Sequence, residues 1–249
     1  MSKRIRKVVR LSACIGAGLL IQLFAGCGKA NTSMPLELRE LKSVEAPASG
    51  LDDQQPTNWE RHDPSNILRY QGKYLLWVTE HARGNGFSDC RIILLSSPDG
   101  LEWTFEQIAL DKNPSKAWDD GGVLTSYVVP YLDNYYLFYT GVEKDFKDPQ
   151  SEPRGMGYVI ADSPYGPWKR PPANQILFPG KKGAWDELCV DDANIIRRGD
   201  KWYFYFKGRA MDSEASESQV GYAVSDNLTG PYEKYEANPL FHGHAFTVT

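Results

Sequence analysis

Cysteine and histidine are both scarce in this sequence, with four residues of each among 249. Cys14 and Cys27 lie near the N-terminus, so only Cys90 and Cys189 remain for the folded part of the chain. The spacing of these two fits no metal-binding motif. In an oxidising compartment they could form a disulfide, or they could remain two separate buried thiols.

Several familiar patterns are also missing. The sequence has no glycine-rich phosphate loop, no dinucleotide-binding fingerprint and no Ser-His-Asp arrangement at a recognised spacing. No segment keeps a helical hydrophobic period over three turns. The sequence therefore gives no support to a nucleotide-binding protein, a serine hydrolase or a helical fold.

The N-terminus has the pattern of an export signal. Five basic residues precede an apolar stretch from Leu11 to Phe24, which is too short to span a bilayer as a mature helix. The stretch ends in Ala25-Gly26-Cys27, which resembles a bacterial lipobox and predicts lipidation of Cys27. Ordinary secretion with cleavage nearby is the alternative. Both interpretations predict an extracytoplasmic protein, and the first a cell-envelope lipoprotein of the periplasm or cell surface.

Removal of the predicted signal peptide, residues 1–26, leaves 23 Lys and Arg against 32 Asp and Glu, a formal net charge of −9. An acidic surface argues against nucleic acid and anionic lipid as partners. Any membrane association would then come from the lipid anchor. Residues 27–57 carry several prolines and no sustained apolar period, so we interpret them as a flexible tether before a folded domain at 58–249.

One passage occurs twice, 64 residues apart. Gly157–Trp168 (GYVIADSPYGPW) returns as Gly221–Tyr232 (GYAVSDNLTGPY), and a looser copy stands at Leu95–Trp103. Self-similarity at a long fixed period indicates one structural unit that is repeated and stacked. Such a unit cannot bury its apolar faces alone and needs its neighbours.

Each unit contains an aromatic segment that is apolar on both alternating faces. These segments are Tyr74–Val78, Tyr135–Tyr139 and Trp202–Phe206. Their composition predicts β-strands, and apolar residues on both faces predict strands covered on both sides. A polar turn and a shorter apolar segment precede each one, which is the pattern of an antiparallel hairpin.

Four antiparallel strands in each unit predict an all-β fold, the blades of a β-propeller. A β-sandwich is the alternative, because it also contains many short strands, but it does not require a repeat. The units begin near Trp59, Trp118 and Trp185, and a fourth begins near Phe241. We therefore expect an incomplete, C-terminally truncated propeller of three blades plus the start of a fourth.

The first strands of propeller blades converge on the axis, so we expect polar residues there to share a pocket. Carboxylates beside apolar strands are costly unless they are paired, hydrated or functional. The candidates are His62, Asp63, Trp118, Asp119, Asp120, Trp185, Glu187, Asp191, Asp192 and His244. A structural role is the alternative for several: a turn at Asp63, blade-closing hydrogen bonds at Asp119 and Asp120, and core packing of the tryptophans. We interpret His81 as a surface loop residue.

At these positions the sequence resembles a known group of enzymes. The motifs are Asp63-Pro64-Ser65 with Gly72-Lys73-Tyr74, Trp118-Asp119-Asp120, Asp192 ten residues before Trp202, and Gly243-His244. Their order and spacing, over about residues 59–249, are similar to those of five-bladed propeller glycoside hydrolases of families 43 and 117. The closer likeness is to family 117, whose characterised members release 3,6-anhydro-L-galactose from neoagaro-oligosaccharides.

The resemblance implies hydrolysis of an oligosaccharide with inversion, by two groups on opposite sides of the sugar. Asp63 would be the general base, Asp192 would orient the sugar or tune a neighbour's pKa, and His244 would be the general acid. We expect the remaining candidates to bind the substrate, with Trp118 and Trp185 stacking on a sugar face. The implied substrates carry α-1,3-linked anhydrogalactose or galactose, or the xylose or arabinose typical of family 43. No cofactor is required. A divalent metal at the propeller axis is an option with no ligands assigned.

Two positions depart from the family 117 pattern. Ala245 stands where that family has a glutamate after the histidine, and Ser126-Tyr127 replaces Pro-Glu in the second blade. A different sugar, a different acid such as Glu187, or a surface lipoprotein that binds carbohydrate without hydrolysing it are therefore alternatives.

Overall fold

The computed structural model describes residues 59–82, 89–115, 117–144, 153–243 and 246–248, all of which belong to the unit spanning Val44–Thr249. The predicted signal peptide, the predicted tether, Cys27 and His244 lie outside these described residues. Within them, no helix is long and apolar enough to cross a membrane.

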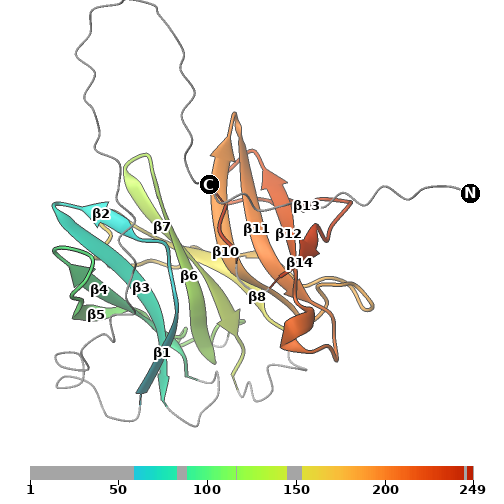
Figure 1. The fold of residues 1–249 in the computed structure, drawn as a ribbon, viewed down its shortest axis with the longest axis horizontal. Helices are drawn as coiled ribbons and strands as arrows, with labels where there is room; N and C mark the ends of the chain where they lie inside the picture. Colours follow the sequence, from blue (N-terminus) through green and yellow to red (C-terminus); the bar gives the residue numbers. More distant parts are fainter. Residues whose placement is uncertain (1–58, 83–88, 116, 145–152, 244–245, 249) are drawn as a thin grey trace, which may run out of the picture. The chain divides into compact units, whose positions relative to one another are not determined.

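Three antiparallel sheets follow one another along the chain (Figure 1). The first contains β1 (Trp59–Pro64), β2 (Leu68–Tyr70), β3 (Lys73–Ala82), β4 (Arg91–Ser97) and β5 (Thr104–Leu110). The second contains β6 (Gly122–Tyr131), β7 (Asn134–Val142), β8 (Gly155–Ala161) and β9 (Gln175–Leu177). The third contains β10 (Cys189–Arg198), β11 (Lys201–Arg209), β12 (Gln219–Ser225), β13 (Glu233–Lys234) and β14 (Phe241–His242), with a short 3₁₀ helix, η2 (Ala215–Glu217), before β12.

Each sheet is a meander of neighbouring strands, as expected for a propeller blade. The strand orders are β1-β3-β4-β5 with β2 also on β3, β6-β7-β8-β9, and β10-β11-β12-β13. The predicted aromatic segments lie in β3, β7 and β11, the second long strand of each sheet. The all-β prediction and the predicted hairpins are therefore confirmed.

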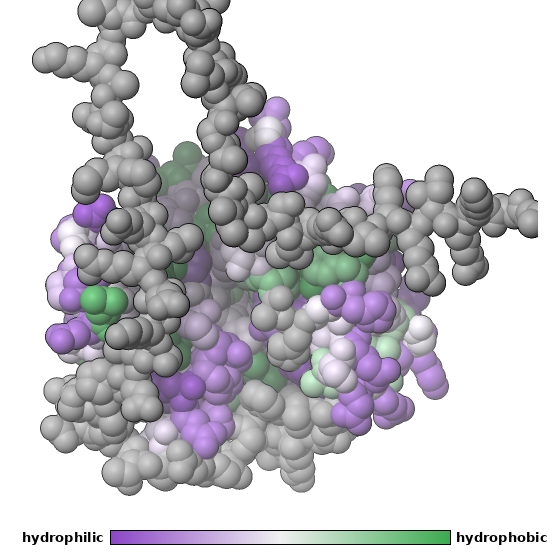
Figure 2. Space-filling view, in the orientation of Figure 1, coloured by the Kyte–Doolittle hydropathy of each residue, from purple (hydrophilic) through white to green (hydrophobic). Residues whose placement is uncertain are grey.

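The middle sheet is covered on both faces. From β7, Leu137 and Tyr139 pack with Trp77 of β3 in the core between the first and second sheets. Phe138, on the opposite face of β7, packs with Phe204 of β11 in the core between the second and third sheets. Burial on both sides explains why the aromatic segments are apolar at successive positions. On the face shown in Figure 2, hydrophobic patches lie between hydrophilic margins.

The repeated sequence forms equivalent structure in the second and third sheets. Its first half is a third strand, β8 or β12, and its second half is a tight turn. In that turn the amide of Gly166 donates to the carbonyl of Ser163 at 2.9 Å, and the amide of Gly230 donates to that of Asn227 at 3.0 Å. Both glycines have φ near +85°, at +85° and +83°, which favours glycine. The repeat therefore encodes one unit of structure.

The segment expected to begin a fourth unit belongs instead to the third sheet. Phe241 and His242 form β14, which pairs antiparallel with Val220 and Gln219 of β12. A two-residue strand can take whichever free strand edge lies nearest, and here that edge is β12. Just beyond it, the carbonyl of Phe246 accepts a hydrogen bond from Asn194 Nδ2 of β10 at 3.2 Å.

Both cysteines of the folded part are free and buried, so the structure matches the separate-thiol alternative. Burial raises the pKa of Cys90 to about 12, and the negative charges of Asp63 and Asp89 add to this effect. Such a thiol is inert at neutral pH.

Candidate active site

A β-bulge interrupts the first strand of all three sheets at corresponding places. The strand register shifts between His62 and Pro64 in β1, between Leu124 and Tyr127 in β6, and between Asp191 and Asn194 in β10. One residue of each bulge has a positive φ: Asp63 at 48°, Thr125 at 44° and Asp192 at 55°. Aspartate tolerates this conformation, but a β-branched threonine is rare there. Bulges of this kind redirect side chains next to active sites.

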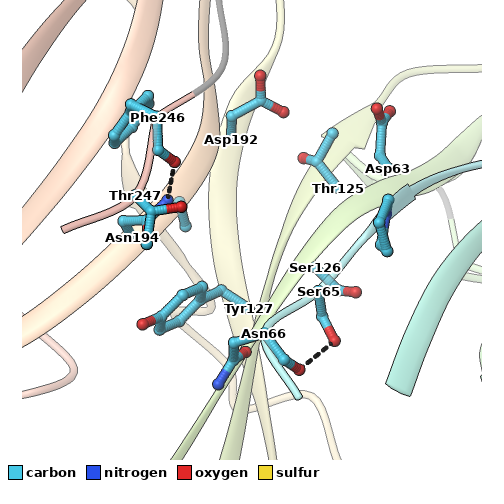
Figure 3. Close-up of a pocket in the computed structure, with 12 residues that line it drawn as sticks. Asp63, Ser65, Asn66, Thr125, Ser126, Tyr127, Asp192, Asn194, Phe246 and Thr247 are labelled. Atoms are coloured by element: carbon cyan, nitrogen blue, oxygen red, sulfur yellow. Dashed lines mark hydrogen bonds between the residues drawn. The ribbon is translucent and has the colours of Figure 1, made fainter. Parts of the chain in front are cut away.

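The three bulge residues line one pocket of about 380 Å³ (Figure 3). In the view of Figure 3, Thr125 lies between the carboxylates of Asp63 and Asp192. The other lining residues are Pro64, Ser65, Asn66, Ser126, Tyr127, Ala193, Asn194, Phe246 and Thr247. The expectation that the first strands of the sheets converge on a shared pocket is therefore met for Asp63 and Asp192.

Asp63 is the more exposed of the two acids, with 43% of its side chain accessible. Its Oδ2 lies 2.7 Å from Nδ1 of His62, so the neighbouring histidine fixes the carboxylate. The ring of His62 meets the edge of His81 at a centroid distance of 5.0 Å. His81 is buried on β3, so the interpretation of His81 as a surface loop residue is wrong. Its Nε2 lies 3.7 Å from Oε2 of Glu60.

Asp192 lines the pocket and is held by an ion pair with Lys207, which does not line it. Its Oδ2 lies 2.6 Å from Nζ of Lys207, and 24% of its side chain is exposed. Burial and, after it, the negative charge of Asp191 outweigh the opposing effect of Lys207 and raise the pKa of Asp192 to about 7. The negative charge of Asp63 also raises the pKa of Asp192, but by less than that of Asp191. A carboxyl group with this pKa can carry a proton near neutral pH.

Asp191 does not line the pocket, contrary to its expected role as a substrate-binding residue. It is only 2% exposed and lies behind Asp192, because successive side chains at the bulge point in different directions. Burial alone would raise the pKa of Asp191, but the Lys207 ammonium and the Arg154 guanidinium outweigh it and hold the pKa well below its usual range.

Trp118 and Trp185, expected to stack on a sugar, are partly buried and pack against the hydrophobic cores beside their sheets. The ring of Trp118 stacks on Tyr139 at 5.5 Å, and that of Trp185 stacks on Phe206 at 5.5 Å. Glycines make room for both rings, because a Cβ at Gly141 would lie 2.2 Å from the indole of Trp118. Each of these two tryptophans packs the beginning of its own unit against the strands that follow.

The acids next to these tryptophans are structural acceptors. Asp119 is buried and accepts hydrogen bonds from the Tyr139 hydroxyl at 2.7 Å and from Arg170 Nε at 2.8 Å. Asp120 accepts from the backbone amide of Lys144 at 2.6 Å. These bonds agree with the blade-closing alternative, and neither carboxylate lines the pocket.

Glu187 also lies away from the pocket, where it accepts a hydrogen bond from the amide of Gly183 at 2.6 Å. This placement argues against Glu187 as the general acid. Among the residues that the structure describes, no group of three or more His, Cys, Asp or Glu side chains is placed to hold a metal ion. A metal at the axis stays an untested expectation.

The candidate residues chosen from the sequence did not include the hydroxyl and amide side chains of the pocket. Thr125 had a detectable signal: it stands ten residues before Tyr135, as Asp192 stands ten before Trp202. Ser126 is 7% exposed, and its Oγ has no hydrogen-bond partner among the described residues. Such hydroxyl and amide groups suit the hydroxyls of a sugar. No Lys, Arg or His is found among the described residues that line the pocket.

Comparison with known proteins places this architecture among glycoside-cleaving enzymes. The model of the family described as "Glycosyl hydrolases family 32 N-terminal domain" matches residues 54–226. A curated relative, "Probable sucrose-6-phosphate hydrolase" of Vibrio cholerae, is 31% identical over 80 residues. That match covers 32% of this chain and 14% of the relative, so the chain spans only a small part of the relative's length.

Two solved structures share the fold. Zg3597, a family 117 glycoside hydrolase produced by the marine bacterium Zobellia galactanivorans, is similar at a TM-score of 0.64 and 26% identity, over 76% of this chain and 59% of that chain. The sucrose-6-phosphate hydrolase from Lactobacillus gasseri has a TM-score of 0.55 and 19% identity, over 74% of this chain and 36% of that chain.

Proposed function

This chain belongs to the family of glycosyl hydrolases family 32 N-terminal domains, and we propose on this premise that its pocket hydrolyses glycosidic bonds in oligosaccharides. The observation that carries the proposal is the meeting of Asp63 and Asp192, from two different sheets, in one pocket lined by hydroxyl and amide groups. In glycosidases one carboxylate can activate the attacking water, and a further carboxyl group in the same pocket can hold the reacting sugar.

In the proposed reaction, Asp63 acts as the general base. Its carboxylate takes a proton from water, the water oxygen attacks the anomeric carbon, and the bond to the leaving sugar breaks as an acid protonates the leaving oxygen. This direct displacement inverts the anomeric configuration. The exposure of Asp63 and its hydrogen bond to His62 support the role of an oriented, solvent-accessible base. His244 remains our proposal for the acid.

Asp192 is proposed to bind the reacting sugar. Since burial and the charge of Asp191 raise its pKa, its carboxyl group can donate as well as accept a hydrogen bond near neutral pH. A second carboxylate that is always ionised would repel the charge on Asp63. A proton held on Asp192 removes this repulsion, so both carboxyl groups can contact the same sugar.

The proposed substrate is a neutral sugar. The described lining carries two acids and no cationic side chain, which disfavours a phosphate or sulfate group on the sugar. This distinguishes the proposal from the phosphorylated substrate named for the Vibrio and Lactobacillus relatives. Anhydrogalactose, galactose, xylose and arabinose units all meet this condition. We further propose that the protein acts in the cell envelope, anchored through Cys27.

A catalytically impaired carbohydrate-binding lipoprotein is the second candidate. The observation that favours it is Ala245, which stands next to the proposed acid in place of a glutamate. Such a protein would keep sugar affinity without releasing product.

The test measures sugar release and sugar binding separately. The panel contains neoagaro-oligosaccharides, aryl xylosides and arabinosides, sucrose and sucrose 6-phosphate. We expect release from a neutral member, no release from sucrose 6-phosphate, and a loss of at least about 100-fold in the Asp63→Asn variant with binding retained. Asp133→Asn, at an exposed turn, is the matched control and should keep full activity.

Binding of a neutral glycan without release from any member would support the second candidate instead. An NMR spectrum of the first product formed tests inversion, since the initial anomer should be opposite to that of the substrate.

A further inference from the structure

The buried carboxylate of Asp191 divides its two oxygen atoms between two kinds of partner. Its Oδ1 lies within hydrogen-bond distance of three neutral donor groups: the Thr125 hydroxyl at 2.9 Å, the Thr140 hydroxyl at 2.8 Å and the backbone amide of Asp192 at 2.9 Å. The two hydroxyls also lie 2.6 Å from each other, so their two protons are shared among these contacts. Two of these donors, Thr125 and Asp192, are bulge residues of different sheets. One oxygen atom therefore ties the bulge of β6 to the bulge of β10.

The other oxygen, Oδ2, faces two cations. Nε of Arg154 lies 3.3 Å away and Nζ of Lys207 lies 3.5 Å away, and both side chains are only 9% exposed. A buried carboxylate without such partners would be strongly destabilising, so the cations are needed to keep it ionised.

Lys207 connects the hidden acid to the pocket. It stands opposite Asp191 in the register of β10 and β11, yet its ammonium lies closer to Asp192, at 2.6 Å from Oδ2. A single cation is thus shared by the buried and the pocket-facing carboxylates. Any change in the charge of Asp191 alters how strongly Lys207 holds Asp192.

From these contacts we propose that Asp191 is a positioning residue: it fixes the bulges of β6 and β10 through Oδ1 and, through Lys207, controls the orientation and charge of Asp192. The charged groups that act on Asp192 are Asp191, Lys207, Asp63 and Arg154. The consequence for catalysis rests on the proposed function, but the contacts themselves can be tested without a substrate.

The test follows the carboxyl carbons of Asp191 and Asp192 by ¹³C NMR during a pH titration of the full chain. In the wild type, Asp191 should stay ionised while Asp192 titrates well above an ordinary aspartate. In Asp191→Asn, the side-chain oxygen can still face the two hydroxyls and the backbone amide, but the charge facing the cations is gone. The Asp192 midpoint should then fall by about one pH unit or more, a tenfold change in its acid constant.

Thr140→Val is the matched control, since it removes a neutral hydroxyl that contacts both Asp191 Oδ1 and the Thr125 hydroxyl but removes no charge, and it should move the Asp192 midpoint far less. An unchanged midpoint in Asp191→Asn, or an equal shift in Thr140→Val, would overturn the proposal. Should Asp191→Asn fail to fold, the wild-type titration alone decides: titration of Asp191 above Asp192 overturns the proposal, and the reverse order supports it.

Failure of the glycosidase proposal is distinguishable from failure of this one. If the protein cleaves no glycan but the Asp192 midpoint still shifts in Asp191→Asn, the positioning role of Asp191 stands and the glycosidase proposal fails. In an active protein, the limb of the pH–rate profile that depends on Asp192 should move in the same direction in Asp191→Asn.

Discussion

At the scale of single residues, the pocket is built from backbone conformations that most side chains avoid. Asp63, Thr125 and Asp192 all adopt positive φ, which costs of order 1–3 kcal/mol for each residue. Hydrogen bonds offset this at Thr125, whose amide donates to the Thr79 hydroxyl at 2.9 Å and whose own hydroxyl reaches Asp191. Strain held at the same place in three sheets supports the proposal that this pocket is the functional one.

Asp192→Asn should change how stability depends on pH. Because the pKa of Asp192 is raised from 3.8 to about 7 on folding, the folded state binds its proton more tightly than the unfolded state. The stabilisation that the Asp192 proton gives the folded state is complete below pH 3.8 and is lost as the pH rises through 7. The wild type loses this stabilisation and the variant does not, so from pH 4 to pH 8 the free energy of unfolding of the variant should rise relative to the wild type by up to about 4 kcal/mol.

Denaturant titrations at several pH values measure this difference, with Asp133→Asn as the control that should track the wild type. A difference between Asp192→Asn and the wild type that does not vary with pH would contradict the assignment.

The two pocket acids were found through their place at the start of apolar strands together with the resemblance to propeller glycoside hydrolases. Position alone was not selective, because it also pointed to Asp119, Asp120 and Asp191. Sequence reasoning misplaced Trp118 and Trp185 because an aromatic residue next to an acid has the same sequence pattern in a sugar-binding site and in a buried structural contact. It also gave Asp191 and Asp192 similar roles, since adjacent residues diverge only where the strand bulges. The bulge depends on the pairing of β10 with β11, and sequence alone does not reveal it.

At the scale of elements, the second and third sheets share a latch that holds the beginning of the unit against its outer strands. In the second sheet the latch is Trp118 on Tyr139 with Asp119 bonded to Arg170. In the third, Trp185 lies on Phe206 and Asp186 accepts from Lys234. The first sheet differs, because Arg91 lies over the ring of Trp59 at 3.9 Å and pairs with Glu80.

Gly141→Ala should weaken the latch of the second sheet. The added methyl group would overlap the Trp118 ring, and overpacking of this kind typically costs about 1–3 kcal/mol. Chemical denaturation measures the loss, and Gly243→Ala, whose Cβ would meet its nearest neighbour at 3.5 Å, is the matched control. Equal stability of the two variants would show that the ring can move aside and that the latch is loose.

The elements that sequence reasoning identified best are the aromatic strands β3, β7 and β11, since a strand apolar on both faces between polar turns has a distinctive pattern. The outer strands are short and half-exposed, so their patterns are weak. β14 was assigned to a new unit because its two residues carry no information about which strand they pair with.

At the scale of the described domain, the pocket exists because separate sheets are joined where their first strands meet. Asn66 of the first sheet donates to the carbonyl of Val128 at 2.9 Å and accepts from the amide of Val128 at 2.8 Å, as a neighbouring strand would. The Thr125–Asp191 bond makes the corresponding link between the second and third sheets. Acids that are more than a hundred residues apart in sequence, Asp63 and Asp192, are thereby brought to one cavity.

A double-mutant cycle on sugar release tests most directly whether these two acids serve one reaction. The specificity constant kcat/KM is measured for the wild type, Asp63→Asn, Asp192→Asn and the double variant on the neutral glycan that the wild type cleaves. Groups that act as a unit lose far less together than the product of their separate losses. We predict a loss of about 100-fold or more in each single variant and little further loss in the double. Separate losses that multiply in full, or wild-type rates in either single variant, would contradict a shared site.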